Sequence, residues 1–412
     1  MKNVLLVCPW LPYPLVSGGD QAIFNGLAVL DRCDNVYFTY PDGGVEKPQE
    51  AYLLEKRLPH VHVIPMLGGG GTVKKSGLAK KIRHAVKLWM KRRLPSLLDS
   101  LVPQDATIDM RFSIVNESFV NHVNELIKTH HIDVVQVEMT QFISFARYLP
   151  NNVRKIFVHH ELRWVANELT ANQKHLGWYG QEQVLNLKLQ EIAMLNQFDQ
   201  IVTLSQTDKD KLLEAGVTKP ILASIAVVAR LENLPEHIEM RPKMLSYVGP
   251  DLHYPNYDGV IWFLENCWEK ILTRDSEYRF QIVGRWTDER RTEILTKYRN
   301  VSFTGFVENL GDAIRGSIMI VPLKIGSGIR MKILEAAQLE VPVVATPVGA
   351  EGLPVKDGEH AFITDDAETF VDDIFKLQDI ALQESLVRNM KDVIEKSYSI
   401  AALKENRKSL YE

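Results

Sequence analysis

The sequence predicts an α/β protein of two doubly wound domains, each built on a parallel β-sheet. Its 412 residues suffice for two domains at roughly 150 residues each. Short, wholly apolar runs alternate with helical stretches, a pattern typical of parallel strands whose two faces are both covered. Apolar residues make up 45% and charged residues 24% of the chain, which argues against extended disorder, collagen-like and coiled-coil structures.

The first half of the chain begins with a strand, a glycine-containing loop and a helix. The strand is KNVLLV, the loop carries Gly18 and Gly19 after several prolines, and the helix is expected over residues 21–30. Further strands are predicted over 35–40, 61–65, 134–137, 155–158 and 200–204.

The second half repeats this alternation more clearly, as expected for a doubly wound domain. Strands are predicted over 244–248, 278–283, 301–304, 317–321 and 341–345, and helices over 258–271, 288–298, 309–315 and 329–339. Proline-containing pairs place the domain boundary between residues 215 and 242. We therefore predict an N-terminal domain over 1–217, a linker over 218–243, a C-terminal domain over 244–385, and helices over 386–412 that pack back on the N-terminal domain.

Charge and cysteine content exclude several classes of protein. With 48 basic and 52 acidic side chains the net charge is −4, which argues against a protein whose whole surface binds polyanions. Cys8, Cys33 and Cys267 are too few and too widely spaced for a disulfide framework or a zinc site, so reduced thiols are expected. No secretion signal is recognised, and no apolar run reaches the about 18 residues of a spanning helix.

Residues 74–93 form a basic segment that has nine Lys and Arg residues and no acidic one. Its apolar residues recur at helical spacing, so we expect an amphipathic helix on an anionic membrane surface, with Trp89 at the interface. The alternative is a helix whose apolar face packs on its own domain. The residues expected at the membrane are Lys80, Lys81, Arg83, Lys87, Trp89, Arg92 and Arg93.

Residues 321–358 are the segment that most clearly indicates a functional site. A strand is followed by a glycine-rich turn and by a helix that has Arg330 and Lys332 in its first turn. A helix N-terminus carries about half a positive charge, so two cations there repel it unless an anion binds between them. The arrangement therefore favours a bound phosphate or diphosphate. The alternative is that Lys332 pairs with Glu335 and that Arg330 is solvated. The turn consists of Gly326, Ser327 and Gly328.

Two further features of this segment indicate a ligand pocket. Glu335 lies among apolar residues one turn into the helix, where a carboxylate needs a partner such as a sugar hydroxyl or Lys332. After the next strand, residues 346–352 form a second loop of small residues at the same carboxyl edge of the predicted sheet. Ligands of open α/β sheets bind at that edge, so the two loops predict one pocket.

This segment resembles the donor-binding region of the family 4 retaining glycosyltransferases (glycosyl transferases group 1). That family has the GT-B fold, in which two doubly wound parallel-sheet domains face an interdomain cleft. The matching runs are GSGIRMKILEA, VPVVATPVGAEGL and DGEHAFI, preceded by SYVGPDLHYPNYDGVIWFLENCWEKI, FQIVGR and VSFTGFV. The resemblance is strong over most of residues 244–365. In the N-terminal half it rests on Gly18-Gly19, FVHHE and DQIVTLS.

The resemblance implies that Glu335 binds ribose or sugar hydroxyls. The family's first glutamate falls on Ser327, and its usual Arg and Lys after the first strand of this domain are absent because Pro250 follows Gly249. We therefore interpret Arg330 and Lys332 as the catalytic cations that bind the diphosphate. The other expected donor-binding residues are Gly18, Gly19, Gly326, Ser327, Gly328, Val307, Gly349, Ala350 and Glu351.

A histidine that touches the donor sugar is also implied, at the end of an apolar strand in the N-terminal domain. His159 and His160 both fit this position, and Glu161 follows them. Because neighbouring residues of a strand point to opposite faces, only one of the two histidines can enter the cleft, and we expect His160 to do so.

Together these features predict a retaining glycosyltransferase of the hexosyltransferase type. The expected donor is a nucleoside diphosphate sugar such as a UDP-sugar, and the acceptor a hydroxyl of a glycan or lipid-linked molecule in polysaccharide, lipopolysaccharide or glycolipid synthesis. No metal or other cofactor is expected, since protein cations act on the diphosphate. No nucleic acid partner is expected either, because the chain outside the basic segment is acidic and shows no nucleic-acid-binding module. The expected location is the cytoplasm, peripheral on the inner face of the membrane. The alternatives are a nucleotide-sugar epimerase of the same fold and a non-catalytic protein that binds nucleotide-sugar or glycolipid.

Overall fold

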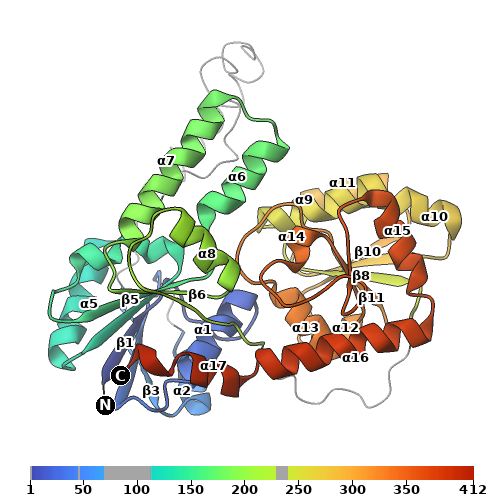
Figure 1. The fold of residues 1–412 in the computed structure, drawn as a ribbon. Helices are drawn as coiled ribbons and strands as arrows, with labels where there is room; N and C mark the ends of the chain where they lie inside the picture. Colours follow the sequence, from blue (N-terminus) through green and yellow to red (C-terminus); the bar gives the residue numbers. More distant parts are fainter. Residues whose placement is uncertain (1, 45–46, 69–111, 113, 229–239) are drawn as a thin grey trace.

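The computed structural model describes residues 2–44, 47–68, 112, 114–228 and 240–412. This part of the chain forms two α/β domains, each with a parallel sheet covered by helices (Figure 1). The basic segment 74–93, with all the residues expected at a membrane, lies outside the described residues.

The N-terminal sheet has the strand order β3-β2-β1-β4-β5-β6-β7, and each neighbouring pair is parallel. Val4 and Leu6 point into one core with Ile23, whereas Leu5 and Val7 point into the opposite core. This alternation explains why the strand is apolar throughout. The strands are β1 (Asn3–Val7), β2 (Asn35–Thr39), β3 (Val61–Val63), β4 (Val134–Glu138), β5 (Arg154–His159), β6 (Gln200–Thr203) and β7 (Ile221–Ala223).

The C-terminal sheet has the order β10-β9-β8-β11-β12-β13 and is also parallel. In both sheets the strand order reverses beside the first strand, which is the topological switch point where open α/β sheets bind ligands at their carboxyl edge. The strands are β8 (Met244–Val248), β9 (Arg279–Val283), β10 (Val301–Gly305), β11 (Ile318–Val321), β12 (Val343–Ala345) and β13 (Phe362–Ile363).

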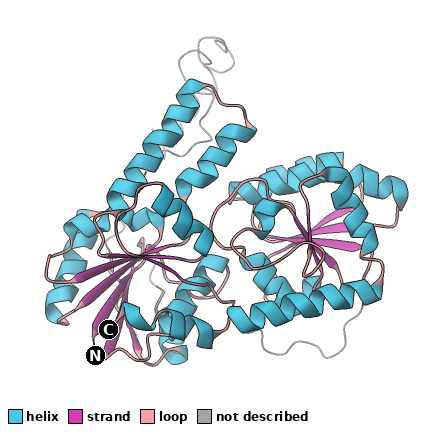
Figure 2. Cartoon of the chain, viewed as in Figure 1, coloured by secondary structure: helices cyan, strands magenta, loops and turns pink. Residues whose placement is uncertain are grey.

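Helices cover the faces of both sheets, as Figure 2 shows. In the N-terminal domain they are α1 (Gly18–Ala28), α2 (Pro48–Arg57), α5 (Glu117–Thr129), α6 (Arg163–Gln173), α7 (Trp178–Leu195) and α8 (Gln206–Glu214), with a 3-10 helix over Thr140–Tyr148. In the C-terminal domain they are α9 (Tyr254–Phe263), α10 (Glu269–Arg274), α11 (Asp288–Lys297), α12 (Leu310–Ile314), α13 (Met331–Leu339), α14 (Pro347–Ala350) and α15 (Ala367–Lys376), with a π-helical turn over Leu264–Trp268. Helices α6 and α7 form a hairpin that projects from the N-terminal domain (Figure 1).

The C-terminal helices divide between the two domains. Helix α16 (Ile380–Ser397) buries Met390 and Ile394 in the core of the C-terminal domain beside α13. Helix α17 (Ile400–Asn406) and the turn Lys408–Leu410 instead pack on the N-terminal domain, where Leu403 contacts Val29. The expected return of the chain to the N-terminal domain therefore starts near residue 400 rather than 386, because the apolar stripe of α16 matches the other domain.

The segment expected as a linker also contains a strand. Ile221–Ala223 forms β7 at the edge of the N-terminal sheet, beside β6. Pro220 just before it obscures this strand in the sequence, although a proline is tolerated at the start of an edge strand.

Candidate functional site

The carboxyl edges of the two sheets face each other, and loops from both domains meet there. The Gly326–Gly328 turn of the C-terminal domain contacts the loop after β5: Ser327 Oγ donates a 2.9 Å hydrogen bond to the Leu162 carbonyl. Gly328 has φ +75°, and a Cβ at this position would lie 2.3 Å from the His160 carbonyl oxygen. Only glycine therefore allows this approach of the two backbones.

Helix α13 presents its N-terminus to this interdomain contact. It begins at Met331, two residues later than predicted, and no side chain caps its first turn within the described chain. From the N-terminal domain, α1 approaches it so closely that a Cβ at Gly18 would lie 2.7 Å from Met331 Cγ. The N-termini of two helices therefore converge, which makes this region favourable for an anion.

Arg330 directly precedes α13, and its side chain is only 7% exposed. Its Nη1 donates hydrogen bonds to the carbonyl oxygens of Ser327 (2.6 Å) and Gly328 (3.1 Å), and its Nε donates to that of Val348 (2.6 Å). The side chain therefore joins the two predicted donor loops, and it is not solvated as the alternative interpretation requires. Burial lowers the pKa of this guanidinium, and the carboxylate of Glu351 opposes that shift.

Lys332 lies in the first turn of α13 and faces the C-terminal domain. Its Nζ donates a 3.1 Å hydrogen bond to Asn256 Oδ1 and lies 5.7 Å from the centre of the Tyr247 ring. Burial lowers its pKa to about 8, although Glu335 favours the charged form. A cation held in this way gains stability when an anion binds nearby.

Glu335 bonds across the domain interface rather than to Lys332. Its Oε1 accepts a 2.9 Å hydrogen bond from Gln21 Nε2, which comes from α1. The ion pair with Lys332, the alternative considered from the sequence, is not formed among the described residues. Burial raises the pKa of the Glu335 carboxyl, and the Gln21 hydrogen bond and Lys332 oppose this shift.

The second small-residue loop also reaches both domains. Thr346 Oγ1 accepts a 3.0 Å hydrogen bond from the Gly349 amide, which caps the short helix α14, and Ala350 is buried. Glu351 accepts a 2.5 Å hydrogen bond from Lys211 Nζ of the N-terminal domain and a 3.4 Å bond from Arg330 Nη2. The loop is therefore held in place by ionic contacts on two sides.

The two adjacent histidines lie in different environments. His159 is 1% exposed, and its Nε2 lies 2.8 Å from Oε1 of the fully buried Glu191, so this pair belongs to the interior of the N-terminal domain. His160 lies at the interface beside Gly328, and its Nε2 is 2.7 Å from Glu138 Oε2.

A hydrogen-bonded chain leads from His160 into the N-terminal sheet. Glu138 and Gln136 are one strand repeat apart on β4, and Gln136 Nε2 donates a 2.6 Å hydrogen bond to Glu138 Oε1. Gln136 in turn accepts a hydrogen bond from the Tyr411 hydroxyl. Glu138 was not among the residues predicted from the sequence; a carboxylate at the end of the valine-rich run VVQVE was the available signal.

Two predicted donor residues lie at the margins of this site. Gly19 follows Gly18 in α1, and a Cβ there would lie 3.1 Å from Met139 Cε of its own domain. Val307 follows β10 and packs half-buried against the core beneath α13.

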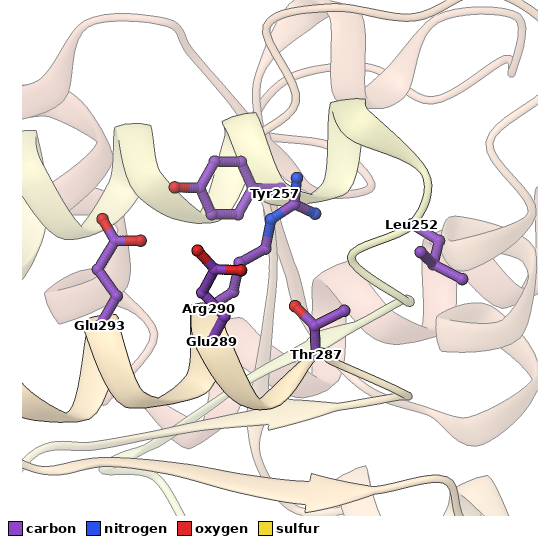
Figure 3. Close-up of a pocket in the computed structure, with 6 residues that line it drawn as sticks. All are labelled: Leu252, Tyr257, Thr287, Glu289, Arg290 and Glu293. Carbon is purple, nitrogen blue, oxygen red and sulfur yellow. The ribbon is translucent and has the colours of Figure 1, made fainter. Parts of the chain in front are cut away.

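A cavity of about 450 Å³ lies beside the interface but has the wrong charge for an anionic ligand. Figure 3 shows Arg290 of α11 reaching over the Tyr257 ring of α9, with Glu289 and Glu293 on the same wall. The guanidinium also donates a 2.6 Å hydrogen bond to the Asp251 carbonyl, so it already has a partner. None of the residues predicted for donor binding lines this cavity.

The described residues show neither a cluster of metal ligands nor a membrane-spanning helix. They contain no group of three or more His, Cys, Asp or Glu side chains arranged to hold a metal ion. None of their helices is both long and apolar enough to cross a bilayer. The absence of a metal requirement remains a prediction.

The C-terminal domain is similar to a known protein family. Residues 242–379 match the family described as Glycosyl transferases group 1. Over its whole length the chain also resembles an uncharacterized 44.6 kDa protein in the cps region of Klebsiella pneumoniae, with 21% identity over 97% of both chains.

Solved structures share the arrangement of both domains. A variant of Staphylococcus aureus TarM, solved in complex with fondaparinux, α-GlcNAc-glycerol and UDP, has a TM-score of 0.69 at 13% identity and covers 100% of both chains. Anabaena HepE in complex with UDP and glucose has a TM-score of 0.64 at 12% identity, covering 100% of this chain and 99% of its own. At these identities the likeness concerns the fold, and the predicted GT-B architecture is confirmed.

Proposed function

We propose that this chain, whose C-terminal domain is a glycosyl transferases group 1 domain, is a retaining glycosyltransferase that uses a nucleoside diphosphate sugar. The observation that carries the proposal is the convergence of the α1 and α13 N-termini beside Arg330, Lys332 and Glu335. This combination offers positive potential to a diphosphate and a carboxylate to sugar hydroxyls.

The leaving diphosphate gains negative charge as the glycosidic bond breaks. Lys332 and the uncapped amides of α13 stabilise that charge, because the fold holds them in place before the donor binds. Arg330 acts chiefly by holding the two donor loops through their carbonyl oxygens, which revises its expected role as a direct diphosphate ligand.

His160 and Glu335 act on the sugar and ribose from opposite domains. Glu138 accepts a hydrogen bond from His160 and so fixes the orientation of the imidazole toward the interface. Gln21 fixes the Glu335 carboxylate in the same way. Retention of configuration and the absence of an enzymic base follow from the family resemblance.

The acceptor is proposed to be a hydroxyl of a glycan or lipid-linked molecule in cell-surface polysaccharide or lipopolysaccharide synthesis, at the cytoplasmic face of the membrane. The similar Klebsiella protein in the cps region supports this class of pathway. UDP is the first candidate for the donor nucleotide, because TarM and HepE were both solved with UDP.

Ligand-induced stabilisation tests the donor site first. We expect UDP to raise the melting temperature more than GDP, ADP or CMP, since saturation at 100 times Kd adds about 2.7 kcal/mol to the free energy of unfolding. Glu335→Gln and Lys332→Met should weaken this effect and abolish transfer from the matching UDP-sugar. The exposed-site variants Glu125→Gln and Lys128→Met serve as matched controls. Near-normal turnover in Glu335→Gln would refute the site.

The same reactions distinguish the alternative activity. His160 with Glu138 could also serve an epimerase, which needs acid and base groups on the N-terminal side of the cleft. Incubation of the enzyme with the donor alone should leave the sugar configuration unchanged. An epimerised donor formed without acceptor would replace the transferase assignment.

A further inference from the structure

A second basic site lies at the opposite edge of the N-terminal sheet from the interdomain cleft. It is a cavity of about 470 Å³, a volume typical of small-ligand pockets. We call it the basic cavity and define it by the cations that line it, which are Lys2, Arg32, Lys404, Arg407 and Lys408.

Three separate parts of the chain build the basic cavity. Lys2 precedes β1, Arg32 lies between α1 and β2, and the remaining cations come from α17 and the turn that follows it. The chain ends N and C lie beside each other at this edge of the domain in Figure 1. Arg154 Nη1 donates a 2.9 Å hydrogen bond to the Leu410 carbonyl, which anchors the C-terminal turn there.

Arg407 is the buried element of the cavity, with 3% of its surface exposed. Its Nε donates a 2.9 Å hydrogen bond to Ser224 Oγ, and within the described chain its terminal nitrogens have no further hydrogen bond or ion pair. A guanidinium with unused donors at the wall of a cavity is suited to a phosphate, which it binds through two parallel hydrogen bonds.

The other cations leave a surplus of positive charge. Lys404 pairs with Asp31 at 2.5 Å and Lys408 with Glu405 at 3.7 Å, and Glu412 also lines the cavity. Lys2 and Arg32 have no ion pair among the described residues. Lys2, Arg32 and Arg407 are therefore the cations of the wall without an ion pair in the described chain, in a protein whose net charge is −4.

We propose that the basic cavity binds a phosphate or diphosphate group, at a site separate from the interdomain cleft and independent of the proposed transfer reaction. The group belongs either to a soluble phosphorylated compound or to the headgroup of an anionic lipid. Both present several oxygens to donors from different directions, which matches cations contributed by three parts of the chain.

Cys33 provides a reporter for this site, because it lines the cavity and is partly exposed, whereas Cys8 and Cys267 are fully buried. The rate of Cys33 alkylation by N-ethylmaleimide is measured by peptide mass spectrometry on the full-length protein. Millimolar pyrophosphate should slow this reaction about fivefold or more, relative to sodium chloride of equal ionic strength, by occluding the thiol. Equal rates in the two salts, with no protection by phosphatidylglycerol vesicles either, would overturn the proposal.

Two double variants that remove the same charge distinguish binding in the basic cavity from nonspecific effects of the protein's net charge. Lys2→Ala with Arg32→Ala should abolish the protection, because both side chains act there without another partner. Lys128→Ala with Lys396→Ala removes the same charge from exposed helices elsewhere and should retain it. Loss of protection in both double variants would indicate nonspecific screening and contradict the proposal.

Vesicles identify the source of the phosphate. Protection by phosphatidylglycerol but not phosphatidylcholine vesicles, without protection by pyrophosphate, would assign the site to a lipid headgroup. Protection by pyrophosphate alone would assign it to a soluble ligand. Vesicle protection that persists in the Lys2→Ala and Arg32→Ala double variant would reject the basic cavity as the binding site.

Discussion

The two walls of the interdomain site use polar residues in different ways. The C-terminal wall holds cations at a helix N-terminus, and among the described residues neither Arg330 nor Lys332 has a close carboxylate partner of its own. The N-terminal wall carries hydrogen-bonded pairs, such as His160 with Glu138, whose members satisfy each other. An anion gains most from the first kind of wall, whereas the second kind fixes the orientation of groups that contact a neutral part of the substrate.

The N-terminal domain contains two histidine–glutamate pairs that differ in position and not in chemistry. His159 with Glu191 is chemically the same pair as His160 with Glu138, yet it lies in the interior, away from the interface. A histidine–glutamate pair therefore indicates a functional site only where a loop of the other domain lies against it, as Gly328 does at His160.

The contact between the walls can be broken at Gly328. Gly328→Ala places a methyl group against the His160 carbonyl and should lower kcat/KM about 100-fold or more, because a displacement of about 1 Å misaligns both walls. Steady-state kinetics with the UDP-sugar measure this loss. Gly358→Ala, at a similar positive φ of +67° with open space around it, has the same backbone strain without the clash and should retain activity. Equal losses in both variants would show that strain alone is responsible.

Each histidine–glutamate pair serves as the control for a variant of the other pair. Glu138→Gln should lower kcat about 10- to 100-fold, the effect of losing one charged hydrogen bond, with little change in melting temperature. Glu191→Gln should do the reverse, because it replaces the charged partner of His159 in the core by a neutral amide, at a cost of about 1–3 kcal/mol in the free energy of unfolding. Thermal melts and steady-state kinetics of both variants test this, and similar profiles would contradict the distinction.

The smallest effect is the pH dependence of the C-terminal wall. Because the pKa of Lys332 is lowered to about 8, the free protein loses this charge as the pH rises through 8, and UDP affinity should then fall by up to about tenfold per pH unit. The unfolded chain binds the proton up to about the ordinary value of 10.5, so the free energy of unfolding should rise between pH 8 and 10.5. Calorimetric titrations with UDP measure the first slope, and denaturant unfolding at several pH values measures the second. Lys332→Met should flatten both slopes. An unchanged slope in the variant would assign the titration to another group.

Sequence patterns determined the architecture and the location of the candidate site. Apolar runs of a few residues alternating with helices require parallel sheets covered on both faces, and the carboxyl edge follows from the order of the elements. Arg330, Lys332 and Glu335 were identifiable because their positions relative to the helix start are local properties of the chain. The edge strand β7 and the division of the C-terminal helices between domains were missed, because they depend on which surface a short apolar stretch meets.

Only the tertiary structure decided the partners of these residues. Glu335 lies within one helical turn of Lys332, but its carboxylate accepts a hydrogen bond from Gln21, which is 314 positions earlier in the chain. Arg330 was predicted to bind a diphosphate, but its guanidinium donates hydrogen bonds to carbonyl oxygens of two folded loops. His160 forms a hydrogen bond with Glu138, which lies on the neighbouring strand β4. A hydrogen bond depends on distances of about 3 Å between atoms that folding brings together, so residue type and spacing alone cannot specify it.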